Sequence, residues 1–460
     1  MQRLVAIACL GLAVAGLCAR LSAAAFTAST ATNSNTVTVD KLANYFSVTP
    51  LNTTVASGNV DSLSLDFGTV PSARTFTSVF RVTNVSGAAR TATLALSSVA
   101  QISSVAFAGG GTSATIAAGG STTVNVITSS TVAGRGAGSL RLGLSGVSWL
   151  YRDYSVRIDE APEAPTAPAV VQKPAGRLDV SWTASTTVTN LAGYDLYRST
   201  GAGYTKLNAT PLTGTTYSDT ATVDGTTYTY KLTAVTNGTP LLTSLDSSTV
   251  SAAADATAPG APTTVALANG GGTGSAYVNA ANASSLSVSI SLPAGSAATD
   301  TVKLTISNGA SNLVVTRSGT AGAGTITISG LNAAFLGDGT LTLSAFSTDA
   351  AGNVGAVKNT SVTKDTAAPA APTANYTDNN NSADQVAGTA EANAAITVNK
   401  TSAPTAQFTT TAAAGGAYSV LVAVVNGKNN APISVTYAVT ATDAAGNTSG
   451  ATTITVNDTR

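Results

Sequence analysis

The residues of this chain that could bind a metal ion lie in a phrase that occurs twice. Asp-Ala-Ala-Gly-Asn stands at residues 349–353 and returns 94 residues later at residues 443–447. Carboxylate and amide oxygens are the ligands that Ca²⁺ prefers, and Asp365 follows the first copy in the connection to the next repeat. We therefore predict a Ca²⁺ site at a domain junction, formed by Asp349, Asn353 and Asp365, and no other cofactor.

The same phrase also has an interpretation that needs no ligand. Gly352 and Gly446 would take a positive φ in the hairpin between the last two strands of a domain, while Asp349 and Asn353 would hydrogen-bond the backbone of the turn. Both interpretations stay open. In the second copy, the residues that could take the same parts are Asp443, Asn447 and Asp458.

Most catalytic chemistry is excluded by missing residue types. The chain has no His, and its two Cys residues, Cys9 and Cys18, lie in the N-terminal leader. Ser-His-Asp triads, Cys-His dyads and the usual zinc sites need imidazole or thiolate. A glycosidase needs two facing carboxylates, but the Glu residues stand only in a linker region, at Glu160 and Glu163, and near a predicted turn, at Glu391. We therefore expect no enzyme and no catalytic residue.

The N-terminus indicates export. Residues 1–25 contain an early Arg3, an apolar run over residues 4–17 and a stretch of small residues, which is the pattern of a secretory signal peptide. The apolar run is shorter than the roughly 20 residues that a membrane-spanning helix needs. We expect a secreted or extracellular protein, with association with the cell wall as a variant, and no membrane span after cleavage.

The overall composition limits the partners and the size of the cores. Basic and acidic residues are balanced at 22 each and make up only 10% of the chain. This balance offers no basic surface for nucleic acid. With 460 residues and an aromatic content of 5%, several small domains are expected rather than one large core.

The local patterns predict strands and connectors. Residues 75–84 alternate in the way of a strand, with Phe76, Ser78, Phe80 and Val82 on one face. Residues 161–168 contain repeated Pro, which cannot enter a central strand and stiffens an extended connector.

The long-range repeat predicts the domain organisation. A period near one hundred residues, in a chain rich in Thr, Val, Ala and Gly, is typical of tandem β-sandwiches. We predict an all-β fold of tandem β-sandwiches arranged as beads on a string, and the motifs below resemble the immunoglobulin-like and fibronectin type III families. The predicted parts are a signal peptide (1–25), an N-terminal sandwich with a leading strand (26–160) and three further sandwiches (161–256, 257–367 and 368–460).

Specific motifs in the second predicted domain resemble the fibronectin type III family. Four of its segments are similar to strands B, C, E and F of that family, and they are residues 178–182, 193–199, 216–219 and 225–235. The resemblance implies that Trp182 is a core aromatic residue. It also implies that Tyr228 forms a tyrosine corner, in which the hydroxyl ties a loop to the sandwich.

The other predicted domains resemble bacterial families. The text Leu-Asp-Phe-Gly-Thr-Val at residues 65–70, followed by the strand at residues 75–84, is similar to bacterial immunoglobulin-like domains. Residues 257–367 resemble the immunoglobulin-like repeats of large bacterial surface adhesins, and residues 368–460 resemble a second bacterial immunoglobulin-like family. The opening Ala-Phe-Thr-Ala-Ser-Thr at residues 25–30 resembles the start of biofilm-fibre and camelysin-type exported proteins.

These resemblances lead to three functional hypotheses. The first is a noncatalytic secreted or cell-surface-associated adhesin or spacer that meets an unknown protein or glycan on a surface. The second is a structural subunit of an extracellular matrix fibre, self-assembled by strand exchange through residues 26–40. The third is a carbohydrate-binding accessory protein, which would need exposed aromatic side chains. Alternation predicts burial for most members of the two aromatic clusters, which are Trp149, Tyr151 and Tyr154, and Tyr194 and Tyr197.

Overall fold

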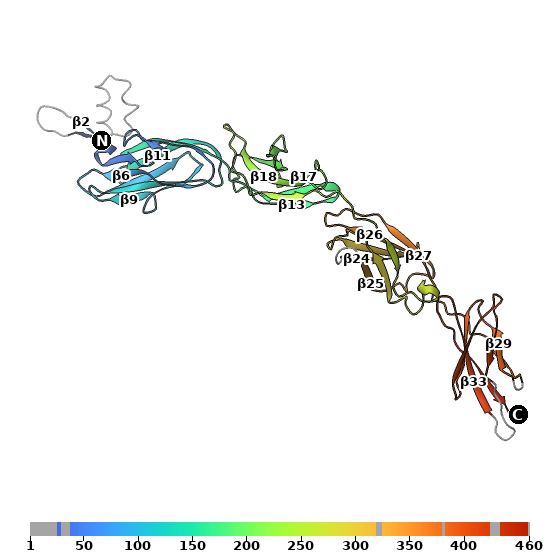
Figure 1. The fold of residues 1–460 in the computed structure, drawn as a ribbon. Coiled ribbons are helices and arrows are strands. Elements are labelled where there is room, and N and C mark those ends of the chain that lie inside the picture. Colours follow the sequence, from blue (N-terminus) through green and yellow to red (C-terminus); the bar gives the residue numbers. More distant parts are fainter. Residues whose placement is uncertain (1–24, 29–36, 319–323, 380–381, 424–432, 459–460) are drawn as a thin grey trace, which may run out of the picture. The chain divides into compact units, whose positions relative to one another are not determined.

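The computed structural model describes residues 25–28, 37–318, 324–379, 382–423 and 433–458 (Figure 1). Apart from Ala25, the predicted signal peptide lies outside these residues. Within the described residues, no helix has the length and apolar character needed to cross a membrane. The regular structure there consists of strands and three short 3₁₀ turns, so the predicted all-β fold is confirmed. These turns are η2 (Leu42–Asn44), η3 (Pro174–Gly176) and η4 (Thr273–Ser275).

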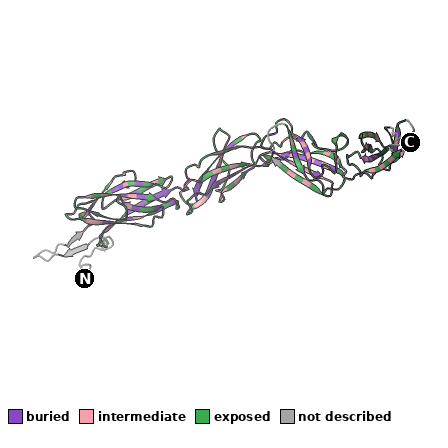
Figure 2. Cartoon of the chain, turned by 90° about the horizontal axis from the view of Figure 1, so that it is seen from below, coloured by how far each residue is buried: buried purple, intermediate pink, exposed green. Residues whose placement is uncertain are grey.

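The buried apolar side chains of the described residues form four clusters, and each cluster lies between two sheets. We call these sandwiches the first to the fourth, in chain order. The chain divides into two compact units. The first and second sandwiches belong to one unit, and the third and fourth belong to the other, which also contains residues Lys173–Ala175. Buried and exposed residues alternate along many strands (Figure 2), as expected where one sheet face packs on a core.

The first sandwich packs a four-stranded sheet against a six-stranded sheet. In sheet order the first contains β3 (Phe46–Pro50), β6 (Thr75–Asn84), β10 (Ser121–Thr128) and β8 (Ile102–Phe107). The second contains β4 (Ala56–Ser57), β5 (Ser64–Val70), β12 (Tyr151–Glu160), β11 (Gly134–Leu144), β7 (Arg90–Ser97) and β9 (Ser113–Ile116). A separate pair, β1 (Ala25–Ala28) and β2 (Val37–Asp40), forms its own two-stranded sheet.

Strand β6 departs from the predicted alternation at one residue. Ser78 has φ of +51°, its N–H donates to Asn125 Oδ1, and the register with β10 shifts beside it. Consequently Val79 and Phe80 are both buried. Residues 77–79 of β6 lie opposite Asn125 alone, so this β-bulge adds two residues to the strand. The predicted face of Phe76, Ser78, Phe80 and Val82 is therefore interrupted at Ser78.

The second sandwich packs a three-stranded sheet on a four-stranded sheet. The sheets contain β13 (Thr166–Gln172), β14 (Leu178–Thr183) and β17 (Thr216–Asp219), and β16 (Thr205–Lys206), β15 (Leu191–Ser199), β18 (Thr227–Thr236) and β19 (Val250–Ala253). Trp182 is buried edge-on to Tyr194, with ring centroids 5.6 Å apart. The Tyr228 hydroxyl accepts the Val223 N–H at 3.0 Å, as expected for a tyrosine corner.

The Pro-rich segment predicted as a stiff, extended connector is partly buried and partly an edge strand. Ala161, Pro162 and Pro165 are buried, and edge strand β13 begins at Thr166. An edge strand tolerates Pro at a bulge, and the register with β14 shifts between Thr166 and Ala169.

The third sandwich has three strands in one sheet and five in the other. They are β20 (Thr264–Leu267), β22 (Leu286–Ser291) and β25 (Thr325–Leu331), and β21 (Tyr277–Val278), β27 (Lys358–Lys364), β26 (Gly339–Thr348), β23 (Thr301–Ser307) and β24 (Asn312–Ser318). The fourth has β28 (Asn375–Thr377), β29 (Asp384–Thr389) and β32 (Ala417–Val422), and β31 (Ala406–Thr411), β30 (Ala395–Lys400), β33 (Ile433–Thr442) and β34 (Thr452–Asp458).

Candidate functional site: the joint of the third and fourth sandwiches

The second Asp-Ala-Ala-Gly-Asn phrase forms the turn between β33 and β34. Both carboxylate oxygens of Asp443 accept hydrogen bonds from Asn447: Oδ1 from the backbone N–H at 2.8 Å and Oδ2 from the side-chain Nδ2 at 2.9 Å. Gly446 has φ of +89°, a region that residues with a Cβ rarely enter. The phrase therefore closes its own turn, and this fixes the plane of the Asn447 carboxamide.

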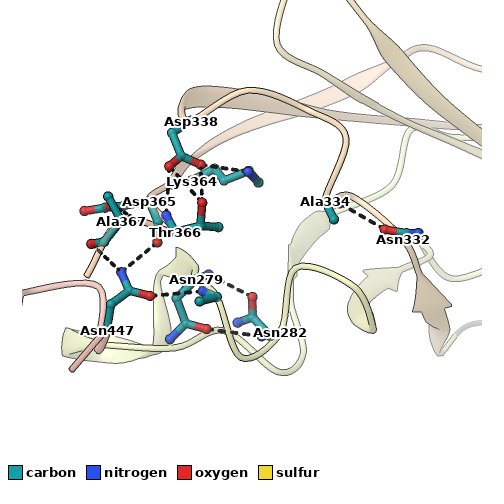
Figure 3. A network of polar contacts seen from close by, with 11 residues as sticks. Asn279, Asn282, Asn332, Ala334, Asp338, Lys364, Asp365, Thr366, Ala367 and Asn447 are labelled. Atoms are coloured by element: carbon teal, nitrogen blue, oxygen red, sulfur yellow. Dashed lines mark hydrogen bonds and ion pairs between the residues drawn. The ribbon is translucent and has the colours of Figure 1, made fainter. Parts of the chain in front are cut away.

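That carboxamide points into the connection between the third and fourth sandwiches (Figure 3). Its Nδ2 donates to the carbonyl oxygen of Asp365 at 2.9 Å and makes a longer contact of 3.4 Å with that of Ala367. Its Oδ1 accepts the backbone N–H of Ala280 at 3.0 Å. Asn447 is only 5% exposed, so its side chain joins the turn, the linker and a loop of the third sandwich.

The third sandwich contributes a second asparagine to this joint. Nδ2 of Asn279 donates to the carbonyl oxygen of Ala445 at 2.8 Å, and the Thr273 N–H donates to that of Ala444 at 2.9 Å. Oδ1 of Asn279 accepts the Ala281 and Asn282 N–H groups within its own loop. The loop is thus held in shape by the residue that reaches across the joint.

An ion pair between a buried lysine and an exposed aspartate holds the linker end of the joint. Lys364, the last residue of β27, is 3% exposed and lies 2.7 Å from Asp338 Oδ1 through its Nζ atom. The Thr366 N–H and hydroxyl also donate to the Asp338 carboxylate (Figure 3). Burial alone would raise the pKa of Asp338, but the donors from Lys364 and Thr366 outweigh it and hold that pKa below its ordinary value.

The first copy of the phrase makes the same set of bonds. Asp349 accepts the Asn353 N–H and Nδ2 at 2.8 Å and 2.9 Å. Nδ2 of Asn353 also donates to the carbonyl oxygen of Asp255 at 3.0 Å, and its Oδ1 accepts the Ala175 N–H at 2.9 Å. Both asparagines therefore bind the linker that precedes their own sandwich and one further backbone N–H.

A comparison with known protein families matches one of the four sandwiches. Residues 368–458 match the family model of the Bacterial Ig domain. The fourth sandwich is thus assigned to the bacterial Ig domain. Its predicted resemblance to a bacterial immunoglobulin-like family is confirmed. No curated protein matches the chain.

Three solved structures are among those similar to the chain. One is the chicken CNTN1 FN1-FN3 domains, with 10% identity, a TM-score of 0.29 and coverage of 65% of this chain and 100% of that chain. A second is an Fn3-like protein from Clostridium thermocellum, with 33% identity and a TM-score of 0.17. This match covers 20% of this chain and 91% of that chain. A third is a tetra-tandem repeat in the extending region of a large adhesion protein, with 19% identity and a TM-score of 0.23. This match covers 83% of this chain and 95% of that chain.

The structure does not bring the three predicted Ca²⁺ ligands together. Asp349 and Asn353 meet in one turn, directly after Thr348 ends β26. Asp365 follows β27, which runs antiparallel to β26 with Lys364 opposite Gly339. The two places are therefore separated by the length of a ten-residue strand, roughly 30 Å at about 3.3 Å per residue. Asp365 instead offers its backbone carbonyl to Asn447 of the bacterial Ig domain.

The matching set in the bacterial Ig domain is separated in the same way. Asp458 pairs with Ile433 at one end of β33, while Asp443 follows the other end. Across the described ranges, no three His, Cys, Asp or Glu side chains are grouped as a metal site would require. The turn hydrogen bonds of the ligand-free interpretation are present in both copies.

Sequence reasoning missed the receiving side of the joint. Asn279 and Asn282 stand three residues apart in Tyr-Val-Asn-Ala-Ala-Asn, but nothing in that text indicates a partner 166 residues away. A hint was available in the spacing of two Asn residues that cap one turn. The role of Asp365 was missed because it acts through its backbone rather than its side chain.

The aromatic clusters are divided between the core and the surface. Tyr154 and Tyr194 are buried, while Trp149 is 40% exposed. Above the Tyr151 ring lies the Arg141 guanidinium, 3.7 Å from the ring centroid, and Lys231 lies 5.7 Å from that of Tyr197. Trp149 is the member of these clusters whose ring is most open to solvent.

Proposed function

We propose that the chain is a noncatalytic adhesin or spacer of the bacterial exterior, secreted or associated with the cell surface, in which neighbouring sandwiches are locked as stiff pairs. The observation that carries this proposal is the Asn447 carboxamide, which satisfies its donor and its acceptor on groups outside its own turn. A spacer has to keep its binding surface at a set distance from its point of attachment. A joint that resists bending serves that purpose.

The energetics of the joint support stiffness. Bending would break the bonds of Asn447 and Asn279 and the Thr273 N–H bond together, because all of them link the same turn to the same loop. A net contribution of about 0.5–1.5 kcal/mol is typical of each such bond, and a buried group left without a partner costs about 1–3 kcal/mol. Three such bonds therefore favour one orientation by about 2–4 kcal/mol.

The partner of such an adhesin is proposed to be a protein or glycan on another surface. Binding residues of sandwich proteins lie mostly on loops that a rigid scaffold positions. The sequence has no His, which is the residue that most often transfers protons in catalysis. For that reason no catalytic role is proposed.

Cell fractionation and force spectroscopy test this proposal. The producing bacterium should yield the protein in the medium or on the cell surface. A single chain pulled from its two ends should show separate unfolding events, each releasing on the order of 30 nm, since a sandwich of about 100 residues extends by about 3.5 Å per residue. Protein retained inside the cell, or a chain that extends without separate events, would rule the proposal out.

A second candidate is a structural subunit of a matrix fibre, favoured by one observation. Among the described strands, β1 and β2 pair with each other and with neither sheet of the first sandwich. An isolated two-stranded hairpin is marginally stable, and its edges are open to pairing with another chain.

Deleting residues 25–40 separates the two candidates. Light scattering and electron microscopy of the full chain and of the deletion variant would be compared at equal concentration. Filaments formed by the full chain and lost in the variant would favour the fibre subunit. Single particles in both samples favour the spacer.

A further inference from the structure

A carboxyl group is buried at the end of the first sandwich that faces the second. Glu160 is the last residue of β12 and is 0% exposed. Its Oε1 accepts the Thr128 hydroxyl at 3.3 Å, and within the described residues its Oε2 has no hydrogen-bond partner. A buried carboxylate left in this state is costly, so such a group stays neutral until the surrounding structure opens.

The segment beside this carboxyl holds the second sandwich. Residues 129–133 connect β10 to β11, and their carbonyl groups accept bonds from the loop at residues 185–190. Asn190 Nδ2 donates to Ala133 O at 2.7 Å, and the Val188 and Thr189 N–H groups both donate to Thr131 O. In return the Ala133 N–H donates to Thr189 O. The loop thus pairs with the segment almost as a short strand.

Glu160 is anchored to both ends of that contact. Thr128, which donates to its carboxyl, directly precedes the segment, and Gly134, which pairs with Glu160 in the β11–β12 ladder, directly follows it. Three residues after Glu160, the Glu163 N–H donates to the Thr187 hydroxyl at 2.9 Å, and the Glu163 carbonyl accepts the Ser185 hydroxyl at 2.7 Å. Any movement that hydrates Glu160 therefore displaces groups that hold the 185–190 loop.

Burial favours the neutral form of Glu160. Burial raises the pKa of Glu160 from its ordinary value of 4.5 to about 8; the Thr128 hydrogen bond and the Arg74 charge lower it, while the Glu163 charge raises it. Asp159, the preceding residue, is held by Arg135 and Arg157, and its own pKa is lowered.

We propose that Glu160 is a proton-operated latch that holds the 185–190 loop of the second sandwich on the first, tight while the carboxyl is neutral and loosened when it ionises. In the open form the carboxyl is hydrated and returns to its ordinary acidity. The closed form therefore binds the proton more tightly. The equilibrium constant that favours the closed form over the open form falls about tenfold per pH unit between pH 4.5 and pH 8, and it is constant outside that range.

Hydrogen exchange of the full chain and of Glu160→Gln tests the latch between pH 5.5 and 8.5. Both proteins are compared at each pH, so the chemical dependence of exchange on pH cancels. In peptides covering residues 129–134 and 185–190, we expect the wild-type rate, relative to the variant, to rise about tenfold per pH unit up to about 8 and then level off. Peptides of β6 serve as the internal control and should keep a constant ratio.

Two results would overturn the latch. One is a constant ratio in the joint peptides, and the other is an equal rise in the β6 peptides, which would mean that Glu160 affects the whole sandwich. Glu163→Gln guards against a Glu160 variant that folds poorly. It removes the charge that raises the pKa of Glu160, so the levelling point should move to lower pH while the slope remains. An unchanged levelling point in that variant would also contradict the latch.

Discussion

At the scale of single residues, the joint depends on a carboxamide rather than a carboxylate. Asn447 donates from Nδ2 to the linker and to Asp443, and accepts at Oδ1 from Ala280. An aspartate in its place has no donor when ionised and would put a second negative charge against Asp443. In the repeated phrase, the Asp therefore stabilises the turn, and the Asn hydrogen-bonds to groups outside the turn.

Replacing Asn447 by Ala should loosen the joint. Asp365 O, Asp443 Oδ2 and the Ala280 N–H each lose a partner, and each buried loss costs about 1–3 kcal/mol before water relieves it. We expect the free energy of unfolding of the bacterial Ig domain to fall by about 2 kcal/mol. Hydrogen exchange in increasing urea, read from peptides of the fourth sandwich, measures this change.

Asn332→Ala is the matched control for that substitution. Asn332 is exposed and accepts the Ala334 N–H inside the third sandwich, away from the joint (Figure 3). Its loss should change stability by less than about 1 kcal/mol. Equal effects of the two substitutions would mean that the bonds across the joint add nothing.

At the scale of elements, alternation and turn residues predict more of the fold than of the site. Strand β6 is predictable as a strand, but the bulge at Ser78 is not, since it depends on the Asn125 side chain of the neighbouring strand. Likewise Pro165 and Pro168 indicate a connector, and only packing shows that an edge strand starts between them. For the site, the turn bonds of Asp349 and Asn353 follow from residue type, whereas the position of Asp365 follows from hairpin geometry.

The close approach of two elements in the joint gives a sharper test. Gly272 has φ of +69°, and a Cβ at this position would overlap the carbonyl oxygen of Ala444. Gly272→Ala should therefore separate the loop from the turn while both cores stay intact. We expect the Thr273 amide, which donates to that oxygen, to exchange at least tenfold faster.

Gly274→Ala is the control for an added Cβ in the same loop. Gly274 has nearly the same φ, +68°, but no atom within 4 Å of the added Cβ. Gly272 has ψ of −159°, a conformation almost restricted to glycine, whereas Gly274 has ψ of +13° and lies in the left-handed helical region. Gly272→Ala therefore carries the larger backbone strain as well as the overlap, while Gly274→Ala carries only the left-handed strain of roughly 1 kcal/mol. If the two variants exchange at the same rate at Thr273, the close approach has no role in the joint.

At the scale of the whole molecule, the repeat explains why the same bond from an asparagine to a linker occurs twice. A turn placed between the last two strands of a sandwich lies beside the linker that enters that sandwich, as Asn353 lies beside Asp255 and Asn447 beside Asp365. Repeating the sandwich repeats this neighbourhood. The bonds need no ion, because the carboxylate and carboxamide groups already have partners in the chain.

The central claim is that the third and fourth sandwiches form a stiff pair without calcium, and a distance distribution tests it most directly. Spin labels would be placed at Ser361→Cys and Thr409→Cys, two exposed strand positions of the second unit, with Cys9 and Cys18 replaced by Ser. Electron–electron double resonance should give one narrow distribution that is the same in millimolar calcium and in chelator, and that broadens in Gly272→Ala. A broad distribution that narrows only with calcium would contradict the claim and restore the ion to the joint.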